Sequence, residues 1–469
     1  MNTMIQPSKA HPLGETISRW ASVILLLGLT AVSLYASGII SVYIWGDAIH
    51  LRFGITYLSY SIILLTSVFS VDCLNFGGKR LHMLAYGVVI SIAIAGVATL
   101  ALPYFIIGSA VSKKLMLVHT VIMLFLSPLW LYISQHIYFS KCPPVKALFI
   151  TDMKTEYWIK DVVNQFSRRY TVADIISPKD KNIEEAIARC PAVLLGTLVT
   201  EDKYRLLGIC ATHNKSVLMR PDYTDIMMTK AQTEQCDDLL LILVHSYGLT
   251  KSQRLLKRIF DVIVSTVALV FLSPIILVCA LIIFLSDWHS PFYLQERYTR
   301  NKKLFKVIKL RSMIPDAEKF DGPVLAEKDD PRITKIGRFM RSTRIDELPQ
   351  FINVLIGDMS IVGPRPERPF FYEQIEQELP EFEQRLSVKC GITGYAQILG
   401  RYTTDPRDKL MLDLMYIKHY SFPLDIKLIL DTVMVLFRKE SSAGVDKTAR
   451  RGAAEETEGS NDDLQSDKD

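Results

Sequence analysis

The sequence DDPRITKIGRFMRSTRIDELPQ occupies residues Asp329–Gln350, and two adjacent carboxylates, Asp346 and Glu347, lie near its end. Arginines surround this pair in the sequence; they are Arg332, Arg338, Arg341, Arg344, Arg365 and Arg368. Such a group suits phosphoryl chemistry, because one acid can act as nucleophile or metal ligand while guanidinium groups hold anionic oxygens. Alone, an Asp-Glu pair is more often a solvated helix start, so the surrounding sequence has to decide.

Upstream of this stretch, Val262–Leu285 is an apolar run with no charge between Asp261 and Asp287. Its length allows a full bilayer crossing as a helix. However, Ser273–Pro274 lies in its middle, and a proline there removes a helical hydrogen bond and favours a kink. Lysines and arginines flank the run on both sides, which favours the cytoplasm for both flanks. The sequence therefore predicts a basic hinge and re-entrant helix over 251–290, with a plain fifth span as the alternative.

The composition indicates that part of the chain lies in lipid, since 49% of the 469 residues are hydrophobic and the mean hydropathy is +0.21. After a polar, cytoplasmic arm over 1–20, residues 21–140 contain four apolar segments of bilayer length. They are Ala21–Trp45, Phe53–Val71, Leu81–Tyr104 and Leu115–Phe139. Buried helices of a soluble fold are the alternative.

Charge orients these four segments. Lys79 and Arg80 follow the second segment, and Lys141 and Lys146 follow the fourth, so the positive-inside rule places both ends of the bundle in the cytoplasm. Lys113 and Lys114 argue weakly the other way. The seven cysteines are scattered without a CxxC pair, so neither a zinc site nor a disulfide framework is expected.

Residues 145–247 alternate short β-branched runs with helical patterns, which predicts a Rossmann-like α/β domain with a parallel sheet. The expected strands are Lys146–Ile150, Thr171–Ile176, Ala192–Thr197, Ser216–Arg220 and a fifth at Leu239–Val244. The expected helices are Tyr157–Phe166, Ile183–Arg189 and Lys203–His213. The turn after the first strand has no glycine, and phosphate-binding glycine motifs are absent, so an interaction or regulatory module is preferred over a nucleotide site.

Residues 291–438 are mainly helical in pattern, with few strand signals. The expected helices are Asp346–Ile356, Phe370–Val388, and the amphipathic Leu410–Tyr420 and Leu424–Phe437. Between them, Cys390–Arg401 reads as a glycine-punctuated loop. Residues 440–469 are small and charged and cannot bury a core, so this tail is predicted to be disordered. The fold class is thus a multi-domain membrane protein, with a four-helix transmembrane bundle, an α/β middle domain and a mainly α catalytic domain.

The segment Lys257–Arg438 resembles the monotopic bacterial phosphoglycosyl transferases, the bacterial sugar transferase family. The matching motifs are KRIFD (Lys257–Asp261), LSP (Leu272–Pro274), FKVIKLRSM (Phe305–Met313), RITKIGRFMRSTRIDELPQ (Arg332–Gln350), NVLIGDMSIVGPRP (Asn353–Pro366), GITGYAQILGR (Gly391–Arg401) and DLMYIKHYS (Asp413–Ser421). With its spans and a middle domain that resembles the family's CoA-binding-like module, the chain is similar to long members that are undecaprenyl-phosphate galactose or glucose phosphotransferases. Cys390 stands where the family usually has proline, which bears only on the rigidity of that loop.

The resemblance implies that a sugar-1-phosphate passes from a UDP-sugar to undecaprenyl phosphate, giving undecaprenyl-diphospho-sugar and UMP and starting exopolysaccharide, capsule or O-antigen synthesis. It implies that Asp346 is the nucleophile, forming a covalent phosphosugar intermediate, and that Glu347, together with Asp346, binds Mg²⁺. The Ser273–Pro274 break matches the family's re-entrant helix. Residues that match phosphate- or substrate-contacting positions are Arg341, Arg365, Lys309, Arg311 and Arg332.

The implied setting is the bacterial cytoplasmic (inner) membrane, with several spans, the catalytic domain on the cytoplasmic side, and no nucleic acid partner. A homodimer, the role of the middle domain and the sugar (galactose, glucose or an N-acetylhexosamine) are left open. One alternative function is a non-catalytic membrane scaffold or regulator of a polysaccharide machine, which would release no UMP. Another is an electrostatic membrane-binding module, which would lose its membrane affinity in high salt.

Overall fold

A computed structural model gives the fold and describes residues 12–45, 53–79, 81–107, 112–152, 169–196, 198–236, 239–244, 248–315, 330–400 and 405–436. Its contacts divide the chain into two compact units, which meet in sequence at Arg220 and Pro221. The predicted tail over 440–469 and the predicted helix Tyr157–Phe166 lie outside the described residues.

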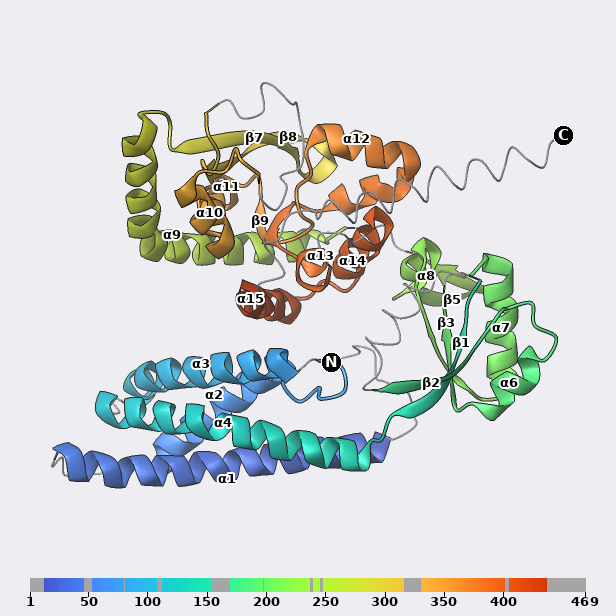
Figure 1. The fold of residues 1–469 in the computed structure, drawn as a ribbon, viewed down its shortest axis with the longest axis horizontal. Helices are drawn as coiled ribbons and strands as arrows, with labels where there is room; N and C mark the ends of the chain where they lie inside the picture. Colours follow the sequence, from blue (N-terminus) through green and yellow to red (C-terminus); the bar gives the residue numbers. More distant parts are fainter. Residues whose placement is uncertain are drawn as a thin grey trace. The chain divides into compact units, whose positions relative to one another are not determined.

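The N-terminal unit begins with four apolar helices, as the sequence predicts. They are α1 (Pro12–Trp45), α2 (Phe53–Ser70), α3 (Leu81–Ile107) and α4 (Lys113–Lys141). Helix α1 packs along α4, and α2 packs along α3 (Figure 1). By length and composition α1, α3 and α4 can each cross a bilayer, whereas Gly54–Ser70 of α2 is a shorter apolar helix.

Helix α1 starts within the predicted polar arm, which is a correction to the boundary at residue 20. The described part of that arm is helical from Pro12 because proline suits a first helical turn and because Glu15 accepts a hydrogen bond of 2.8 Å from Arg19 one turn later. Within the bundle, small hydroxyl side chains such as Ser22 and Thr30 donate to carbonyls of their own helix. The hydrogen bonds satisfy these two hydroxyl groups inside their own helix, and such small side chains allow neighbouring helices to approach closely.

The same unit continues into a four-stranded parallel sheet of order β2–β1–β3–β4. The strands are β1 (Val145–Ile150), β2 (Tyr170–Ile176), β3 (Ala192–Leu195) and β4 (Ser216–Met219). Alternate residues of β1 and β3 are buried on both faces, as a parallel sheet requires. Helices α6 (Ile183–Arg189) and α7 (Thr200–Thr212) pack on one face (Figure 1). The predicted parallel sheet is confirmed for these four strands, and the finer Rossmann-like classification stays a prediction.

The fifth predicted strand is wrong as a member of this sheet. Strand β6 (Leu239–Leu243) pairs antiparallel with β5 (Gln232–Cys236) and lies in the second unit, after α8 (Tyr223–Met228). Only two residues separate β5 from β6, which suits a hairpin but is far too short for a crossover between parallel strands.

The second unit is built on α9 (Lys251–Asp287), a long helix with Pro274 in its interior. Figure 1 shows α9 turning sharply part-way along its length, and a proline such as Pro274 inside a helix is a known cause of such a bend. By length and composition alone the helix could also cross a bilayer.

The first half of α9 is held by polar contacts. Asp261 accepts hydrogen bonds from Ser360 Oγ at 2.8 Å and from the backbone of Ile361 at 3.1 Å, and Lys257 Nζ lies 2.6 Å from the carboxylate of Asp425. The second half is held by apolar packing. Its residues Ile276, Cys279, Ala280 and Ile283 form a buried cluster with Leu310 and Met340.

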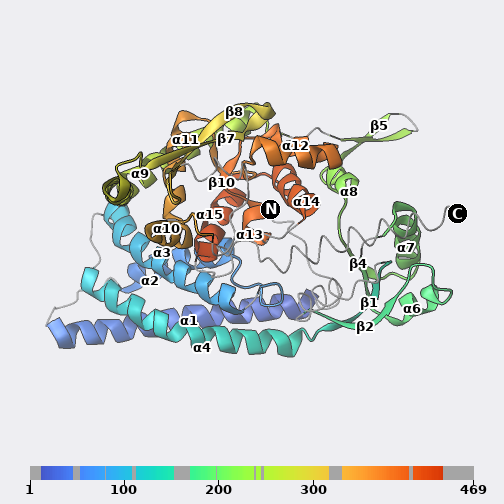
Figure 2. The same cartoon turned by 45° about the horizontal axis from the view of Figure 1, so that its top comes forward.

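Strands play a larger part in this unit than the sequence predicted. An antiparallel hairpin of β7 (Phe292–Tyr298) and β8 (Leu304–Leu310) packs on α11 (Gln350–Ile356) and α12 (Pro369–Glu378) (Figure 2). The expected loop Cys390–Arg401 contains β10 (Gly391–Thr393), parallel to β9 (Ser360–Val362), and α13 (Tyr395–Leu399). Strands β7 and β8 each carry two charged residues, and β9 and β10 have only three residues each, so their sequences give a weak strand signal.

The predicted helix Phe370–Val388 is also broken. Helix α12 ends at Glu378, and a 3-10 helix, η3 (Pro380–Ser387), follows, because Pro380 has no N–H to continue the α-helical hydrogen bonds. The two amphipathic helices are confirmed as α14 (Pro406–Lys418) and α15 (Phe422–Leu436). Their buried faces, with Leu414, Tyr416 and Leu428, complete the core of the unit around Val362 and Leu386.

The buried ion pair between Lys257 and Asp425 joins α9 to α15, and its contribution to stability can be measured. Their side chains are only 7% and 1% exposed. Removing one partner of a buried pair leaves an uncompensated charge, so we expect Lys257→Met to lower the free energy of unfolding by about 3 kcal/mol. Thermal unfolding of the detergent-solubilised protein measures this. The double variant with Asp425→Asn should recover most of the loss, and equal loss in the single and double variants would contradict the assignment.

Candidate active site

Asp346 and Glu347 lie in a 3-10 helix, η2 (Ile345–Glu347), between α10 (Lys335–Thr343) and α11. The expected helix from Asp346 onward is therefore corrected: the carboxylates precede α11, which starts only at Gln350 after Pro349. Arg344 ends α10 in the left-handed conformation, with φ of 58°, and redirects the chain. This turn brings both carboxylates beside strand β8.

Glu347 is surrounded by cations from three segments. Its Oε1 accepts hydrogen bonds of 3.1 Å from Lys309 Nζ on β8 and of 3.1 Å from Arg365 Nη2. Arg344 Nη1 lies 3.7 Å from Oε2. Burial alone would raise the pKa of Glu347, but the charges of Lys309, Arg365 and Arg344 outweigh it and hold the pKa well below its usual range. Glu347 is therefore a permanent carboxylate at neutral pH.

Asp346 has the opposite environment. The residue is only 9% exposed, and its side chain makes no hydrogen bond with any residue that the structure describes. Burial, with the negative charge of Glu347 next to it, raises the pKa of Asp346 to about 6, although Lys309, Arg341 and Arg344 oppose this. Two neighbouring carboxylates with pKa values pushed apart are typical of residues with separate chemical roles.

Arg341 joins the site from the last turn of α10. Its Nε donates a hydrogen bond of 2.9 Å to Ser312 Oγ, and its charge acts on the carboxylate of Asp346. A close contact makes this placement possible: a Cβ on Gly337 would collide with the carbonyl oxygen of Ser312, so only glycine lets α10 approach. The backbone of Thr334 also donates to that oxygen, at 3.1 Å.

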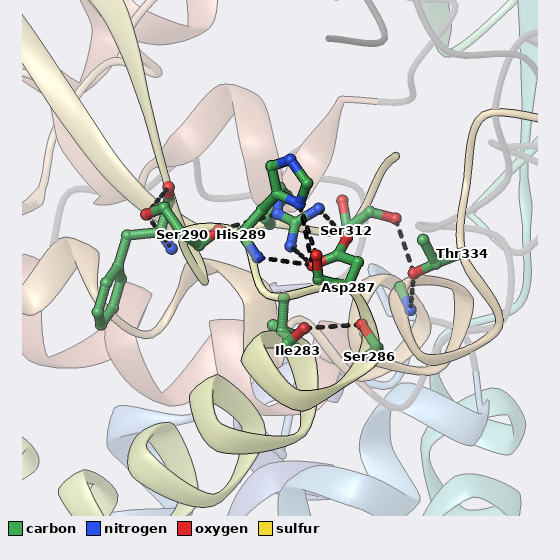
Figure 3. A network of polar contacts seen from close by, with 10 residues as sticks. Ile283, Ser286, Asp287, His289, Ser290, Ser312 and Thr334 are labelled. Carbon is green, nitrogen blue, oxygen red and sulfur yellow. Dashed lines mark hydrogen bonds and ion pairs between the residues drawn. The ribbon is translucent and has the colours of Figure 1, made fainter. Parts of the chain in front are cut away.

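Two of the predicted phosphate-binding residues are engaged with other carboxylates. Arg311 binds both carboxylate oxygens of Asp287 at 2.6 Å and the carbonyl of Ser290 at 2.9 Å. Figure 3 shows this network, with Asp287, His289 and Ser290 at the end of α9 and with Ser312 and Thr334 nearby. Arg332 binds Asp330, with 2.7 Å between Nη2 and Oδ2. The structure thus brings Lys309, Arg341 and Arg365 to the carboxylates, whereas Arg311 fastens α9 to β8.

The predictions missed three arginines. Arg344 was noted only as part of the arginine-rich stretch, and Arg297 only as a flanking charge, although both act on Glu347. Arg385 lies in none of the matching motifs; it is buried, and its Nη2 donates a 2.9 Å hydrogen bond to the carbonyl of Arg365. Its partner Asp413, within the DLMYIKHYS motif, was the available clue.

The donor groups also bear on the predicted Mg²⁺. Within the described ranges, no group of three or more His, Cys, Asp or Glu side chains could hold a metal ion. Mg²⁺ is commonly bound through one or two carboxylates, with water and substrate phosphates completing its shell. Asp346 offers a carboxylate that forms no hydrogen bond with the described residues, while the oxygens of Glu347 already face three cations. The site therefore fits a metal ion that substrate phosphates share.

A model of the family described as bacterial sugar transferase matches residues 252–439, which contain the whole site. The exopolysaccharide production protein of Rhizobium leguminosarum bv. phaseoli is 40% identical over 190 residues, which cover 38% of this chain and 94% of that protein. The chain belongs to the bacterial sugar transferase family.

Two other relatives carry names that specify a reaction. The UDP-glucose:undecaprenyl-phosphate glucose-1-phosphate transferase of Klebsiella pneumoniae is 39% identical over 232 residues, 48% of this chain and 50% of that protein. The UDP-N-acetylgalactosamine-undecaprenyl-phosphate N-acetylgalactosaminephosphotransferase of Aeromonas hydrophila is 38% identical over 184 residues, 39% of this chain and 43% of that protein. The chain thus spans about half the length of these curated relatives.

The raised pKa of Asp346 makes a prediction about stability. A carboxyl group whose pKa is raised by folding stabilises the folded state as pH falls through about 6 toward its unfolded pKa, and opposes folding above that range. We expect Asp346→Asn to raise the free energy of unfolding at pH 7.5 by about 2 kcal/mol. This magnitude follows from about 1.4 kcal/mol per pKa unit, reduced because the two carboxylates titrate together. The variant should also lack the gain in stability that the wild type shows between about pH 6 and pH 4. Unfolding at several pH values measures this. An Asp346→Asn variant less stable than wild type at pH 7.5 would contradict the assignment.

Proposed function

We propose that the protein transfers a sugar-1-phosphate from a UDP-sugar to undecaprenyl phosphate, releasing UMP, as the first step of an exopolysaccharide, capsule or O-antigen pathway. The observation that carries this proposal is the pair of neighbouring carboxylates with opposite environments, inside the region that matches the family. The names of the relatives in Klebsiella and Aeromonas support the substrate classes.

In the first half-reaction, an oxygen of Asp346 attacks the phosphorus that carries the sugar. The bond from that phosphorus to the oxygen bridging to UMP breaks, and UMP leaves with the bonding electrons. Asp346 suits this role because no hydrogen bond to the described chain ties up its carboxylate, and because a pKa of about 6 leaves it ionised at neutral pH. The product is an acyl phosphate that carries the sugar.

In the second half-reaction, a phosphate oxygen of undecaprenyl phosphate attacks the same phosphorus and releases the Asp346 carboxylate. Covalent catalysis suits substrates from water and from lipid, because each can occupy the site in turn. Arg365, Lys309 and Arg341 surround the reacting phosphate in this scheme. The negative charge of Glu347 keeps Lys309 and Arg365 in place between substrates, at 3.1 Å each.

When bound, Mg²⁺ would neutralise the diphosphate and its leaving group, held by Asp346, Glu347 and substrate oxygens. The chain's own cations supply part of the same compensation. Glu347 is already ionised, and its charge is balanced by the cations around it. It therefore keeps these cations charged and in place with or without a bound metal ion.

We also propose that α9 enters the membrane and returns to the same side. A straight helix of 37 residues would be about 55 Å long, longer than the hydrocarbon core of a bilayer. Yet Asp261 in its first half and Asp287 at its end both bind the same folded unit, and the helix turns sharply between them (Figure 1). Basic residues on both flanks favour the cytoplasmic face of the inner membrane, where UDP-sugars are made.

The test of the proposal is UMP release by the membrane-bound protein with undecaprenyl phosphate and a panel of UDP-sugars carrying glucose, galactose, N-acetylglucosamine or N-acetylgalactosamine. We expect release with at least one sugar. We expect Asp346→Asn to lower that turnover by about 10³-fold or more and to abolish the radiolabelled phosphosugar adduct, since the nucleophile is lost. A variant that still turns over and still forms the adduct would show that Asp346 is not the nucleophile. No UMP release with any sugar would favour the non-catalytic scaffold.

Glu347→Gln tests the second carboxylate. Loss of its charge leaves Lys309 and Arg365 uncompensated and removes one proposed Mg²⁺ ligand, so we expect a lower kcat and at least a tenfold higher Mg²⁺ concentration for half-maximal rate. The same change removes a negative charge next to Asp346 and so lowers the pKa of that carboxyl group, and we expect the acidic limb of the pH profile to move to lower pH than in the wild type. Mg²⁺ and pH titrations of UMP release measure both effects. An unchanged Mg²⁺ requirement would argue against metal binding by Glu347.

A further inference from the structure

The segment Gly363–Glu367, here called the Arg365 loop, has an unusual backbone environment, because a donor engages every carbonyl from Pro364 to Glu367. Backbone N–H groups take the two outer carbonyls: Gly391 donates to Pro364 at 2.9 Å, and Tyr298 donates to Glu367 at 3.3 Å. Arginine side chains take the two inner carbonyls, those of Arg365 and Pro366.

The first of these arginines is Arg385, from η3. Its Nη2 donates to the carbonyl of Arg365 at 2.9 Å, while its Nε and Nη2 bind the carboxylate of Asp413 at 2.9 and 2.8 Å. Both side chains are only 2% exposed. Burying two charges is costly, so apolar side chains could fill this space at least as favourably. What apolar residues could not supply is a fork of donors that binds Asp413 and still reaches a carbonyl.

The second is Arg297, from β7 of the hairpin. Its Nη1 donates to the carbonyl of Pro366 at 3.1 Å, and its Nη2 donates to Gln295 Oε1 at 2.6 Å. The carboxylate of Glu367, the next residue of the loop, lies 3.8 Å from Nη1. Two arginines from separate elements therefore hold adjacent carbonyls of one short loop.

The backbone of the Arg365 loop sets the position of the Arg365 side chain. Arg365 Nη2 donates to Glu347 Oε1 at 3.1 Å, so the loop backbone decides how far this cation stands from both carboxylates. We propose that Arg385, held by Asp413, and Arg297 are positioning residues: they lock the Arg365 loop so that the Arg365 guanidinium faces Glu347 and the reacting phosphate. This inference rests on the proposed function, since the rate of that reaction reports it.

Arg385→Lys and Arg297→Lys test the proposal. A lysine keeps the charge and can still pair with one carboxylate, but its single nitrogen cannot also hold the loop carbonyl in the same geometry. We expect each variant to lower kcat about tenfold or more with less than threefold change in KM for the UDP-sugar, since small misplacements of catalytic groups are costly. The acidic limb of the pH profile should move to higher pH, because Arg365 then offsets less of the negative charge beside Asp346.

Arg205→Lys is the matched control. Arg205 likewise binds an aspartate, Asp202 at 2.9 Å, and a backbone carbonyl, that of Pro178 at 2.6 Å, but it lies in the N-terminal unit. It should leave kcat and the pH limb unchanged. Thermal unfolding of every variant shows whether it folds. Asp413→Asn is a third test variant, since it weakens the ion pair that holds the Arg385 side chain without changing Arg385 itself.

The outcomes separate the two proposals. A wild-type protein without UMP release overturns the proposed function. An active wild type with Arg385→Lys and Arg297→Lys variants that keep their kcat and pH limb overturns the positioning role alone. If activity falls only in proportion to the folded fraction and the acidic limb does not move, the contacts are structural, and the positioning role is overturned. The same conclusion follows if Arg385→Lys, Arg297→Lys and Asp413→Asn all unfold.

Discussion

The site is organised by the need to balance the negative charge of one buried carboxylate, that of Glu347. Glu347 is only 14% exposed and remains charged, and a buried charge without partners is too costly to persist. Its partners come from β8, from the end of α10 and from the Arg365 loop, so these three segments must converge on it. The negative charge of Glu347 acts on Asp346, the preceding residue, whose side chain makes no hydrogen bond with the described part of the chain. The reactive character proposed for Asp346 thus follows from a constraint on its neighbour.

The membrane-type helix α9 is tied into this arrangement by charged side chains at both ends. Asp261 holds the first residues of β9, which lead directly into the Arg365 loop, and Asp287 holds Arg311 at the end of β8, close to Lys309. An apolar segment flanked by such fixed polar contacts can lie in lipid while its ends stay with the water-soluble fold. Strand β8, which carries Lys309, and strand β9, which leads into the Arg365 loop, are therefore anchored to the same helix.

Individual residues show which features of the fold and the site could be predicted from sequence patterns. The long helices, the four parallel strands and the Asp346–Glu347 pair were predictable, because hydrophobic period and motif spacing are local properties. The β7–β8 hairpin was missed, since its strands carry as many charges as a solvated helix. Arg311 and Arg332 were placed with the phosphate-binding residues because of their position in matching motifs. In the structure they bind Asp287 and Asp330, and no spacing rule distinguishes an arginine that binds substrate from one that binds a carboxylate.

By itself, the sequence determined the apolar helices, the α/β alternation and the family motifs with their acid pair. These depend on residue type and short-range order, which are read directly from the chain. Only the tertiary structure decided which cations reach Glu347, why Asp346 and Glu347 differ in pKa, and that Arg385 and Arg297 stand behind Arg365. The physical reason is distance: electrostatic and hydrogen-bonding effects act over a few ångströms, between groups that lie tens of residues apart in the sequence.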